Sequence, residues 1–373
     1  MSINISFIEI ENEHDISSDE YDEIITKYDS FNDIIQLDNY DDIKYISCYK
    51  LNINVVPILP KNLITLYCDK NKLKNLPLLP VNLKILSCYK NNLTSLPNLP
   101  NSLKELKCYV NNLSSLPNLP NSLIALWCDS NSISSLPNLP NSLTILHCNV
   151  NGLSSLPNLP NSLTDLECMH NNLSIIPKIP ESLSCLRCCF NNLSILPKLS
   201  NSLIELNCSD NWLVNLPKLP NSLTVLLCYN NNISILPELP HSLITLYCWC
   251  NKISKLPELP NLLTNLLCYN NKISSLPKLP DNLEKLSCSN NNIKELPELP
   301  EHITHIVCKS NLLIKIPKLP ISNKLIYLDC SRNNLAELPR GISTIEKVIY
   351  SRNPIYKKIR KLSYLELYDI NNK

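Results

Sequence analysis

Cysteine is the residue type in this chain best suited to nucleophilic or metal chemistry, but its spacing points elsewhere. Fifteen of the 18 cysteines follow one register, every twenty residues from Cys48 to Cys308 and then Cys330 after a two-residue insertion. Apolar residues alternate around each of them, as in Leu106 and Cys108, which is typical of a short strand with one buried face. The register therefore predicts cysteines that pack inside a repeat protein.

The three remaining cysteines are the candidates for thiol chemistry. Cys185, Cys189 and Cys250 are expected on the open face of the strands. A catalytic thiol needs a nearby histidine or cation that lowers its pKa. His147 and His170 stand one or two repeats from Cys185 and Cys189, but no local motif places a base. Thiol catalysis is therefore the minor interpretation, and the sequence predicts no catalytic residue.

Metal and cofactor sites are also not predicted. Cys185 and Cys188 form a CxxC motif, but strand alternation sends them to opposite faces, and no second pair with ligand spacing follows. Gly152 and Gly341 are the only glycines in the chain, which excludes glycine loops that cradle phosphate.

The repeat reads LxxLxCxxNxLxxLPxLPxx. Its asparagine stands where the chain leaves each strand, and its amide can bond backbone groups of its own and the adjacent turn. We therefore expect stacked ladders, exemplified by Cys108, Asn111, Cys128 and Asn131. The LPxLP half excludes a helix, because proline fixes φ and lacks a donor, and it predicts an extended, polyproline-like return.

This unit resembles the short bacterial-type leucine-rich repeats of secreted enterobacterial effectors, and the Asn, Ile and Lys bias is similar to that of giant-virus proteins. The resemblance covers residues 43–355. It implies a leucine-rich repeat solenoid with parallel strands on the concave face and a role in binding host proteins. Some such effectors append a ubiquitin-ligase domain, which we do not expect here. Cys208-Ser209-Asp210 matches the ligase CxD string, but Cys208 is a ladder position and is expected in the core.

Three segments are predicted: an acidic segment over 1–42, an array of about 15 or 16 repeats over 43–355, and a basic cap over 356–373. The first segment carries thirteen Asp or Glu and one Lys, a charge of −12, which leaves +13 on the rest. It is either a solvated cap or a segment that folds onto the basic array and competes with a ligand.

Both ends of the array are expected to carry helical caps, because a solenoid exposes apolar surface at each end. One helix is predicted over 17–36, with a capping box at Ser17 and Glu20. A second is predicted from Pro354 to Leu367. The apolar stripe of the first helix is Tyr21, Ile24, Ile25, Tyr28, Phe31, Ile34 and Ile35.

No apolar run reaches membrane-spanning length, and the start, MSINISFIEIENE, lacks the basic region of a signal peptide. We therefore expect a cytoplasmic protein, in the host cytoplasm if it is viral, with reduced cysteines.

The candidate binding residues flank the buried positions of the strands and project from the concave face. Large aromatics gather in a first aromatic zone (Tyr67, Tyr89, Tyr109 and Trp127) and a second aromatic zone (Tyr229, Tyr247, Trp249 and Tyr269), with Glu167 and Arg187 between them. Such residues are enriched in binding hot spots, but they also favour strands because they stack across neighbours.

The sequence thus predicts a non-enzymatic protein that binds a protein or extended peptide on its concave sheet, as a host-interaction factor. One alternative is substrate recognition for ubiquitin transfer, with the ligase on another chain. Another is a nucleic-acid-binding array, although acidic residues interrupt the concave face and the lysines are spread over all surfaces. The pattern leaves the oligomeric state open.

Overall fold

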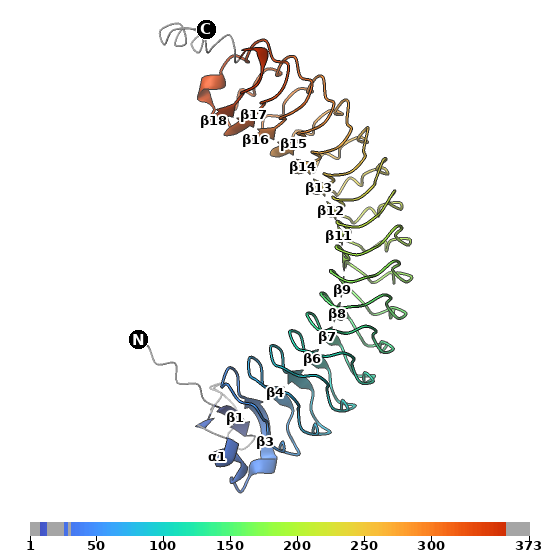
Figure 1. The fold of residues 1–373 in the computed structure, drawn as a ribbon, viewed down its shortest axis with the longest axis vertical. Helices are drawn as coiled ribbons and strands as arrows, with labels where there is room; N and C mark the ends of the chain where they lie inside the picture. Colours follow the sequence, from blue (N-terminus) through green and yellow to red (C-terminus); the bar gives the residue numbers. More distant parts are fainter. Residues whose placement is uncertain (1–7, 13–25, 29–30, 356–373) are drawn as a thin grey trace, which may run out of the picture. The chain divides into compact units, whose positions relative to one another are not determined.

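The computed structural model describes residues 8–12, 26–28 and 31–355. Contacts divide the chain into two compact units, Met1–Leu183 and Ser184–Lys373. Each unit is a leucine-rich repeat solenoid in which every coil has a strand on one side and a proline-rich segment on the other (Figure 1). The predicted fold class is confirmed.

The first unit begins with two strands and a short helix and continues as a parallel sheet. β1 pairs antiparallel with β2 and with β3, and each strand from β3 to β8 pairs parallel with the next. The elements are β1 (Ile8–Asn12), β2 (Thr26–Tyr28), α1 (Phe31–Ile35), a 3-10 turn (Tyr40–Asp42), β3 (Ile43–Ser47), β4 (Thr65–Tyr67), β5 (Ile85–Ser87), β6 (Glu105–Lys107), β7 (Ala125–Trp127), β8 (Ile145–His147) and β9 (Asp165–Glu167).

The second unit is built the same way, with each strand from β10 to β17 paired parallel with the next. Its elements are β10 (Cys185–Arg187), β11 (Glu205–Asn207), β12 (Val225–Leu227), β13 (Thr245–Tyr247), β14 (Asn265–Leu267), β15 (Lys285–Ser287), β16 (His305–Val307), β17 (Tyr327–Asp329), a 3-10 turn (Ile342–Thr344) and β18 (Lys347–Ile349).

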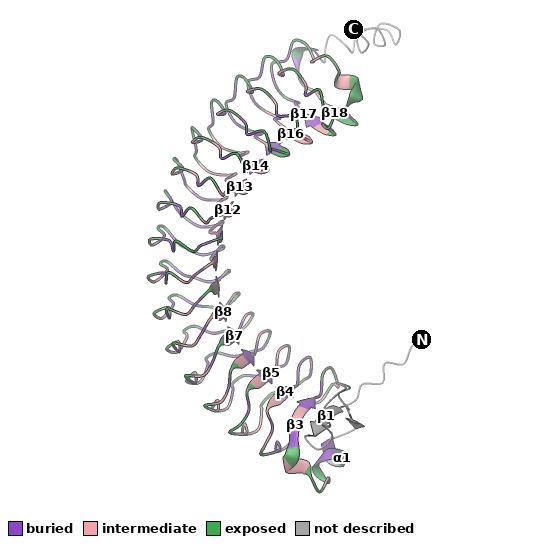
Figure 2. Cartoon of the chain, turned by 180° about the vertical axis from the view of Figure 1, so that it is seen from behind, coloured by how far each residue is buried: buried purple, intermediate pink, exposed green. Residues whose placement is uncertain are grey.

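Leucine and cysteine side chains make up most of the core of each unit, and buried residues recur from coil to coil (Figure 2). In the repeat that starts at Leu103, the side chains of Leu103, Leu106, Cys108 and Leu113 are all 0 % exposed. All fifteen cysteines of the register are buried thiols, as predicted. Burial raises the pKa of Cys288 to about 12, because the thiolate would lose its hydration. These cysteines therefore act as small apolar residues.

The asparagine ladder is observed, and each of its members ties two coils together. Asn111 Nδ2 donates to the carbonyl oxygens of Cys88 (3.0 Å) and Cys108 (3.1 Å), and Asn111 Oδ1 accepts from the backbone N–H of Leu93 (3.0 Å). The same bonds recur at Asn231 and at Asn353. One buried amide thus satisfies backbone groups that the strand leaves unpaired.

The residue before each ladder asparagine adopts a left-handed backbone, which the sequence pattern did not predict. From Lys70 to Arg352, φ at this position lies between 49° and 59°. Few of these residues suit that region, and Val110 and Val150 are β-branched. The signal was present in Asp210, Asn230, Asn270 and Asn290, because Asn and Asp adopt this conformation most readily after glycine.

The proline side returns without a helix or strand, as predicted, in the repeats from Ile53 to Leu319. The return ends in a turn where the N–H of Leu123 donates to the carbonyl of Pro120 (3.1 Å). Ser122 Oγ donates to the carbonyl of Leu103 at 2.6 Å, and the serine at the same place in other repeats bonds the preceding coil in the same way. In these repeats, hydroxyl groups link the proline side of one coil to the preceding coil in place of helix hydrogen bonds.

The N-terminal cap is partly helical, but the predicted helix over 17–36 is wrong at 26–28. Thr26–Tyr28 form strand β2, and α1 is limited to Phe31–Ile35. Backbone pairing explains this, because β1 covers the edge of β3, whose N–H and C=O groups would otherwise be unpaired, and β2 pairs with β1 in turn. Phe31 and Ile34 are buried, as the predicted stripe requires, but Ile35, also part of that stripe, is 41 % exposed. Residues 13–25 and 29–30 lie outside the described residues, as does the predicted C-terminal helix beyond residue 355.

Candidate functional site

The strand face is the candidate binding surface. All ten residues predicted to bind a partner are half-buried, and their role in binding stays a prediction. Strand alternation explains their position: Leu106 is fully buried, whereas its neighbours Glu105 and Lys107 are half-buried. Because every strand pairs in register with the next, residues twenty apart form columns across the sheet of each unit.

A depression of about 480 Å³ opens in the strand face of the first unit, and we call it the aromatic depression. Two columns line it, one just before and one just after the ladder cysteines. Ser87 is the small residue of the first column, and it leaves a gap between the larger side chains of Tyr67 and Lys107. The lining residues are Tyr67, Ser87, Lys107 and Trp127 in the first column and Asp69, Tyr89, Tyr109 and Asp129 in the second.

The rings of the first aromatic zone are fixed by contacts with their neighbours. Tyr89 and Tyr109 stack with centroids 4.4 Å apart and planes at 7°. Trp127 meets the ring of His147 edge to face at 6.0 Å. Lys107 Nζ lies over the Trp127 ring, 5.0 Å from its centroid. Such contacts hold aromatic side chains in one orientation, which lowers the entropic cost of a ligand binding to them.

Two carboxylates line the aromatic depression, and both have a raised pKa. Asp69 is only 3 % exposed, and its Oδ1 accepts from Ser87 Oγ (2.6 Å) and from the N–H of Tyr89 (2.9 Å). Burial raises the pKa of Asp69 to about 6, although these hydrogen bonds oppose the shift. Burial also raises the pKa of Asp129, which accepts from the N–H of Asn149 at 2.8 Å.

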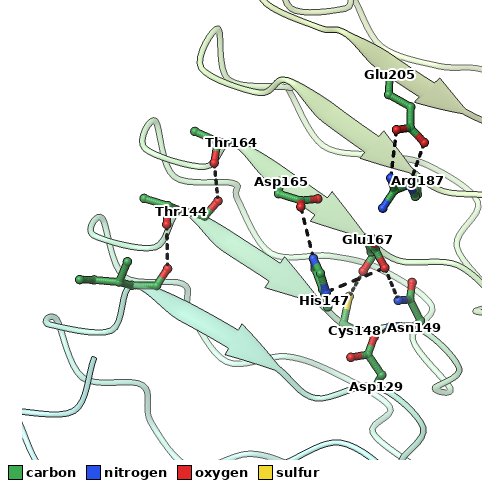
Figure 3. A network of polar contacts seen from close by, with 11 residues as sticks. Asp129, Thr144, His147, Cys148, Asn149, Thr164, Asp165, Glu167, Arg187 and Glu205 are labelled. Atoms are coloured by element: carbon green, nitrogen blue, oxygen red, sulfur yellow. Dashed lines mark hydrogen bonds and ion pairs between the residues drawn. The ribbon is translucent and has the colours of Figure 1, made fainter. Parts of the chain in front are cut away.

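His147 lies beside the depression with a carboxylate near each ring nitrogen (Figure 3). Its Nε2 is 3.4 Å from Asp165 Oδ2, and its Nδ1 is 3.9 Å from Glu167 Oε2. Burial lowers the pKa of His147, but the contact with Asp165 and the charges of Glu167, Asp165 and Asp129 outweigh it and raise the pKa. The negative charges of the two carboxylates favour the positively charged, protonated ring.

Sequence reasoning missed this cluster. One ligand atom each from His147, Asp165 and Glu167 lies within 4.8 Å of the others, so the trio also carries donors of the kind that bind divalent cations. The signal was the column reading, in which His147 and Glu167 are register partners on β8 and β9. Cysteine spacing gives no sign of this cluster, because none of its three residues is a cysteine.

The second aromatic zone is a continuous stack. Tyr229 and Trp249 lie 4.1 Å apart and Trp249 and Tyr269 lie 5.0 Å apart, with planes at 7° in both pairs. Tyr247 belongs to the other column, where Leu227 and Leu267 are its register partners. Stacking across strands therefore fixes the orientation of Tyr229, Trp249 and Tyr269.

The second unit also places the predicted residue Arg187 in a two-point ion pair. Arg187 Nε lies 2.8 Å from Glu205 Oε1, and a second guanidinium nitrogen donates to Oε2 at 2.9 Å (Figure 3). This fork geometry fixes the guanidinium plane against β11.

The cysteine predictions need one correction. Cys185 and Cys250 are half-buried, but Cys189, predicted to be exposed, is only 4 % exposed. Small side chains directly after a ladder cysteine are covered, as Ser209 (0 % exposed) illustrates. Cys208 is also 0 % exposed, and burial raises its pKa to about 12, so its CxD string lacks the reactive thiolate that the chemistry requires.

Fold, ladders and strand face define a leucine-rich repeat protein with 20-residue repeats. YopM from Yersinia enterocolitica is 36 % identical, with a TM-score of 0.74 over 81 % of this chain and 72 % of that chain. YopM from Yersinia pestis, described as a leucine-rich effector protein, is 37 % identical, with a TM-score of 0.73 over 81 % of this chain and 87 % of that chain. The chain belongs to this family of bacterial-type leucine-rich repeat proteins.

A third structure shares the fold alone. The functional domain of InlJ from Listeria monocytogenes, which includes a cysteine ladder, is 23 % identical, with a TM-score of 0.57 over 80 % of this chain and 70 % of that chain. Neither the protein-family models nor the curated sequences gave a match. The described residues contain no helix long and apolar enough to cross a membrane. The similarity to giant-virus proteins stays a prediction.

Proposed function

We propose that this chain is a non-enzymatic binding protein that holds a protein or an extended peptide on the concave strand face. The aromatic depression is the observation that carries the proposal, because it combines fixed rings with a buried and a half-buried carboxylate on an otherwise regular sheet. Membership of the leucine-rich repeat family supports protein binding as the general role. The effector description of the related YopM supports the narrower role of a host-interaction factor that acts in the host cytoplasm.

Each repeat has constant, buried positions and variable positions on the strand face, and this also favours the strand face as the binding surface. Leucine, cysteine and asparagine side chains build the frame and are buried, so they are not available to a ligand. The two columns beside the ladder cysteines vary from repeat to repeat while the frame stays constant. Varied side chains on a rigid frame are what a specific surface requires.

Site-specific crosslinking tests the proposal. A photo-crosslinking amino acid replaces Tyr109 on the strand face or, as the matched control, Leu78, which is 85 % exposed on the proline side. Both variants are irradiated in host lysate, and the crosslinked proteins are identified by mass spectrometry. We expect a partner that crosslinks at position 109, does not crosslink at 78, and is lost when Trp127 and Trp249 are replaced by alanine.

Crosslinking at position 78 with none at 109 would place the ligand on the proline side and overturn the proposal. Recovery of ligase components with the partner would instead favour substrate recognition for ubiquitin transfer. Retention of RNA or DNA that falls steeply with salt would favour a nucleic-acid-binding array.

A further inference from the structure

The aromatic depression has the walls of a cation-binding pocket. Tyr67 and Trp127 lie in the first column, three strands apart, which is about 14 Å at ordinary strand spacing. The Tyr89–Tyr109 stack lies in the second column, on the two repeats between them. The faces of aromatic rings carry partial negative charge and attract ammonium and guanidinium groups. The chain's own cations already use this property.

Two lysines show that these rings accept cations. Lys70 Nζ lies 5.8 Å from the centroid of Tyr89, and Lys107 Nζ lies 5.0 Å from that of Trp127. Lys107 has a second partner, because its Nζ is also 3.9 Å from Glu105 Oε2, and both side chains are at least one third exposed. Lys107 can therefore move from the ring to Glu105 when another cation arrives.

The carboxylates of the depression select the charge of its occupant. Asp69 and Asp129 stand at opposite ends of the column that contains the tyrosine stack. An acidic ligand would be repelled by these two like charges, and an apolar ligand would remove more of the solvent near them, which is costly. A cationic side chain satisfies both the rings and the carboxylates.

Arginine fits this combination better than lysine. Its planar guanidinium can lie flat on an aromatic ring while its edge donates to a carboxylate, whereas an ammonium group is a compact and strongly hydrated charge. A space of about 480 Å³ also leaves room for backbone on either side of the arginine. We infer that the aromatic depression binds an arginine side chain presented by an extended segment of the partner protein, an inference that rests on the proposed function.

Short peptides test this without knowledge of the partner. The probes are acetyl-Gly-Gly-Arg-Gly-Gly-amide and the same peptide with citrulline, which has nearly the shape of arginine but no charge. Trp127 becomes the sole tryptophan of the full chain when Trp212 and Trp249 are replaced by phenylalanine, and its fluorescence reports binding. We expect saturable binding of the arginine peptide with Kd on the order of 1 mM, and binding of the citrulline peptide weaker by about tenfold or more.

Variants separate the pocket from the general charge of the surface. Asp69→Asn keeps an oxygen acceptor for Ser87 and Tyr89 and removes the charge, and we expect a loss of about tenfold in affinity. Lys107→Ala removes the internal competitor and is expected to tighten binding severalfold. Asp281→Asn, an exposed acid on the other unit, is the matched control and leaves affinity unchanged. Thermal melts establish that each variant is folded.

Equal binding of the arginine and citrulline peptides, or no binding of the arginine peptide up to roughly 20 mM, would overturn the inference. A crosslinked partner at position 109 together with no arginine binding would leave the proposed function standing and remove only this pocket. Arginine binding without any crosslinked protein would support the pocket and count against the proposed function. The affinity is also expected to fall below pH 6, since the pKa of Asp69 is about 6 and its protonated form carries no charge.

Discussion

Asn111 donates from Nδ2 to the carbonyl oxygen of Cys88, a residue 23 positions earlier, at 3.0 Å. The same amide also bonds its own coil, so its removal leaves buried backbone groups of two coils without a hydrogen-bond partner. We expect Asn111→Ala to lower the free energy of unfolding by about 3 kcal/mol, measured by urea denaturation. The exposed neighbour Asn112 is the control, and Asn112→Ala should change the free energy by less than about 0.5 kcal/mol. Equal effects at the two positions would contradict the ladder's role.

Val150 has φ of 51°, a conformation that a β-branched residue tolerates poorly. Val150→Asn should therefore stabilise the protein by about 1 kcal/mol, because asparagine adopts the left-handed region at lower cost. Val214 has similar exposure and no positive φ, and Val214→Asn should give no gain. The urea midpoints of the two variants measure this difference. A loss of stability in Val150→Asn would show that the left-handed backbone of Val150 is not strained.

Cysteine reactivity should divide by position. Cys208 is buried, with a pKa of about 12, so we expect iodoacetamide to leave it unmodified in the native protein. Half-buried Cys250 should react first, and all 18 cysteines should react in denaturant. Mass spectrometry of timed samples measures the rates. Native labelling of Cys208 as fast as that of Cys250 would mean that the core opens readily.

The His147 cluster should make stability depend on pH. Its folded pKa is raised above 6.5 by Asp165, Glu167 and Asp129, against the opposing effect of burial. The protonated ring therefore stabilises the fold fully below the ordinary histidine pKa, and this contribution is lost as the pH rises through the higher folded value. Urea midpoints of the wild type and His147→Gln across this range measure the difference.

Asp165→Asn is the matched variant for this pH dependence. It removes the nearest carboxylate, 3.4 Å from Nε2, and should bring the titration of His147 back toward its ordinary pKa. Nuclear magnetic resonance follows that titration directly. An unshifted wild-type histidine would show that burial, which lowers its pKa, cancels the effect of the carboxylates, and this would contradict the prediction.

Local chemistry explains what the sequence could predict. One repeat already shows the twenty-residue period, the buried Cys108 and the ladder Asn111, and the array repeats these features. The prolines exclude a helix on the return segment. Strand β2 at Thr26–Tyr28 was not predictable in this way, because it depends on backbone pairing with β1 and not on side-chain periodicity.

The candidate site was predictable only in part. Aromatic columns can be read from the sequence, and so the two zones were found. The aromatic depression, in contrast, depends on a small Ser87 between larger residues of its column, and the His147 cluster depends on the directions that side chains take from two strands. Both are relations between repeats, which no single repeat encodes.

The two-residue insertion before Cys330 bears on how the chain can be engineered. β16 and β17 pair in register, His305 with Tyr327, although 22 residues separate them, and Leu313 still donates to Asn333 Oδ1 at 3.1 Å. The longer coil keeps its strand and its ladder bond. The segment near Ile321 is thus a natural insertion site, where a reporter peptide or an affinity tag can be added without disturbing the binding surface.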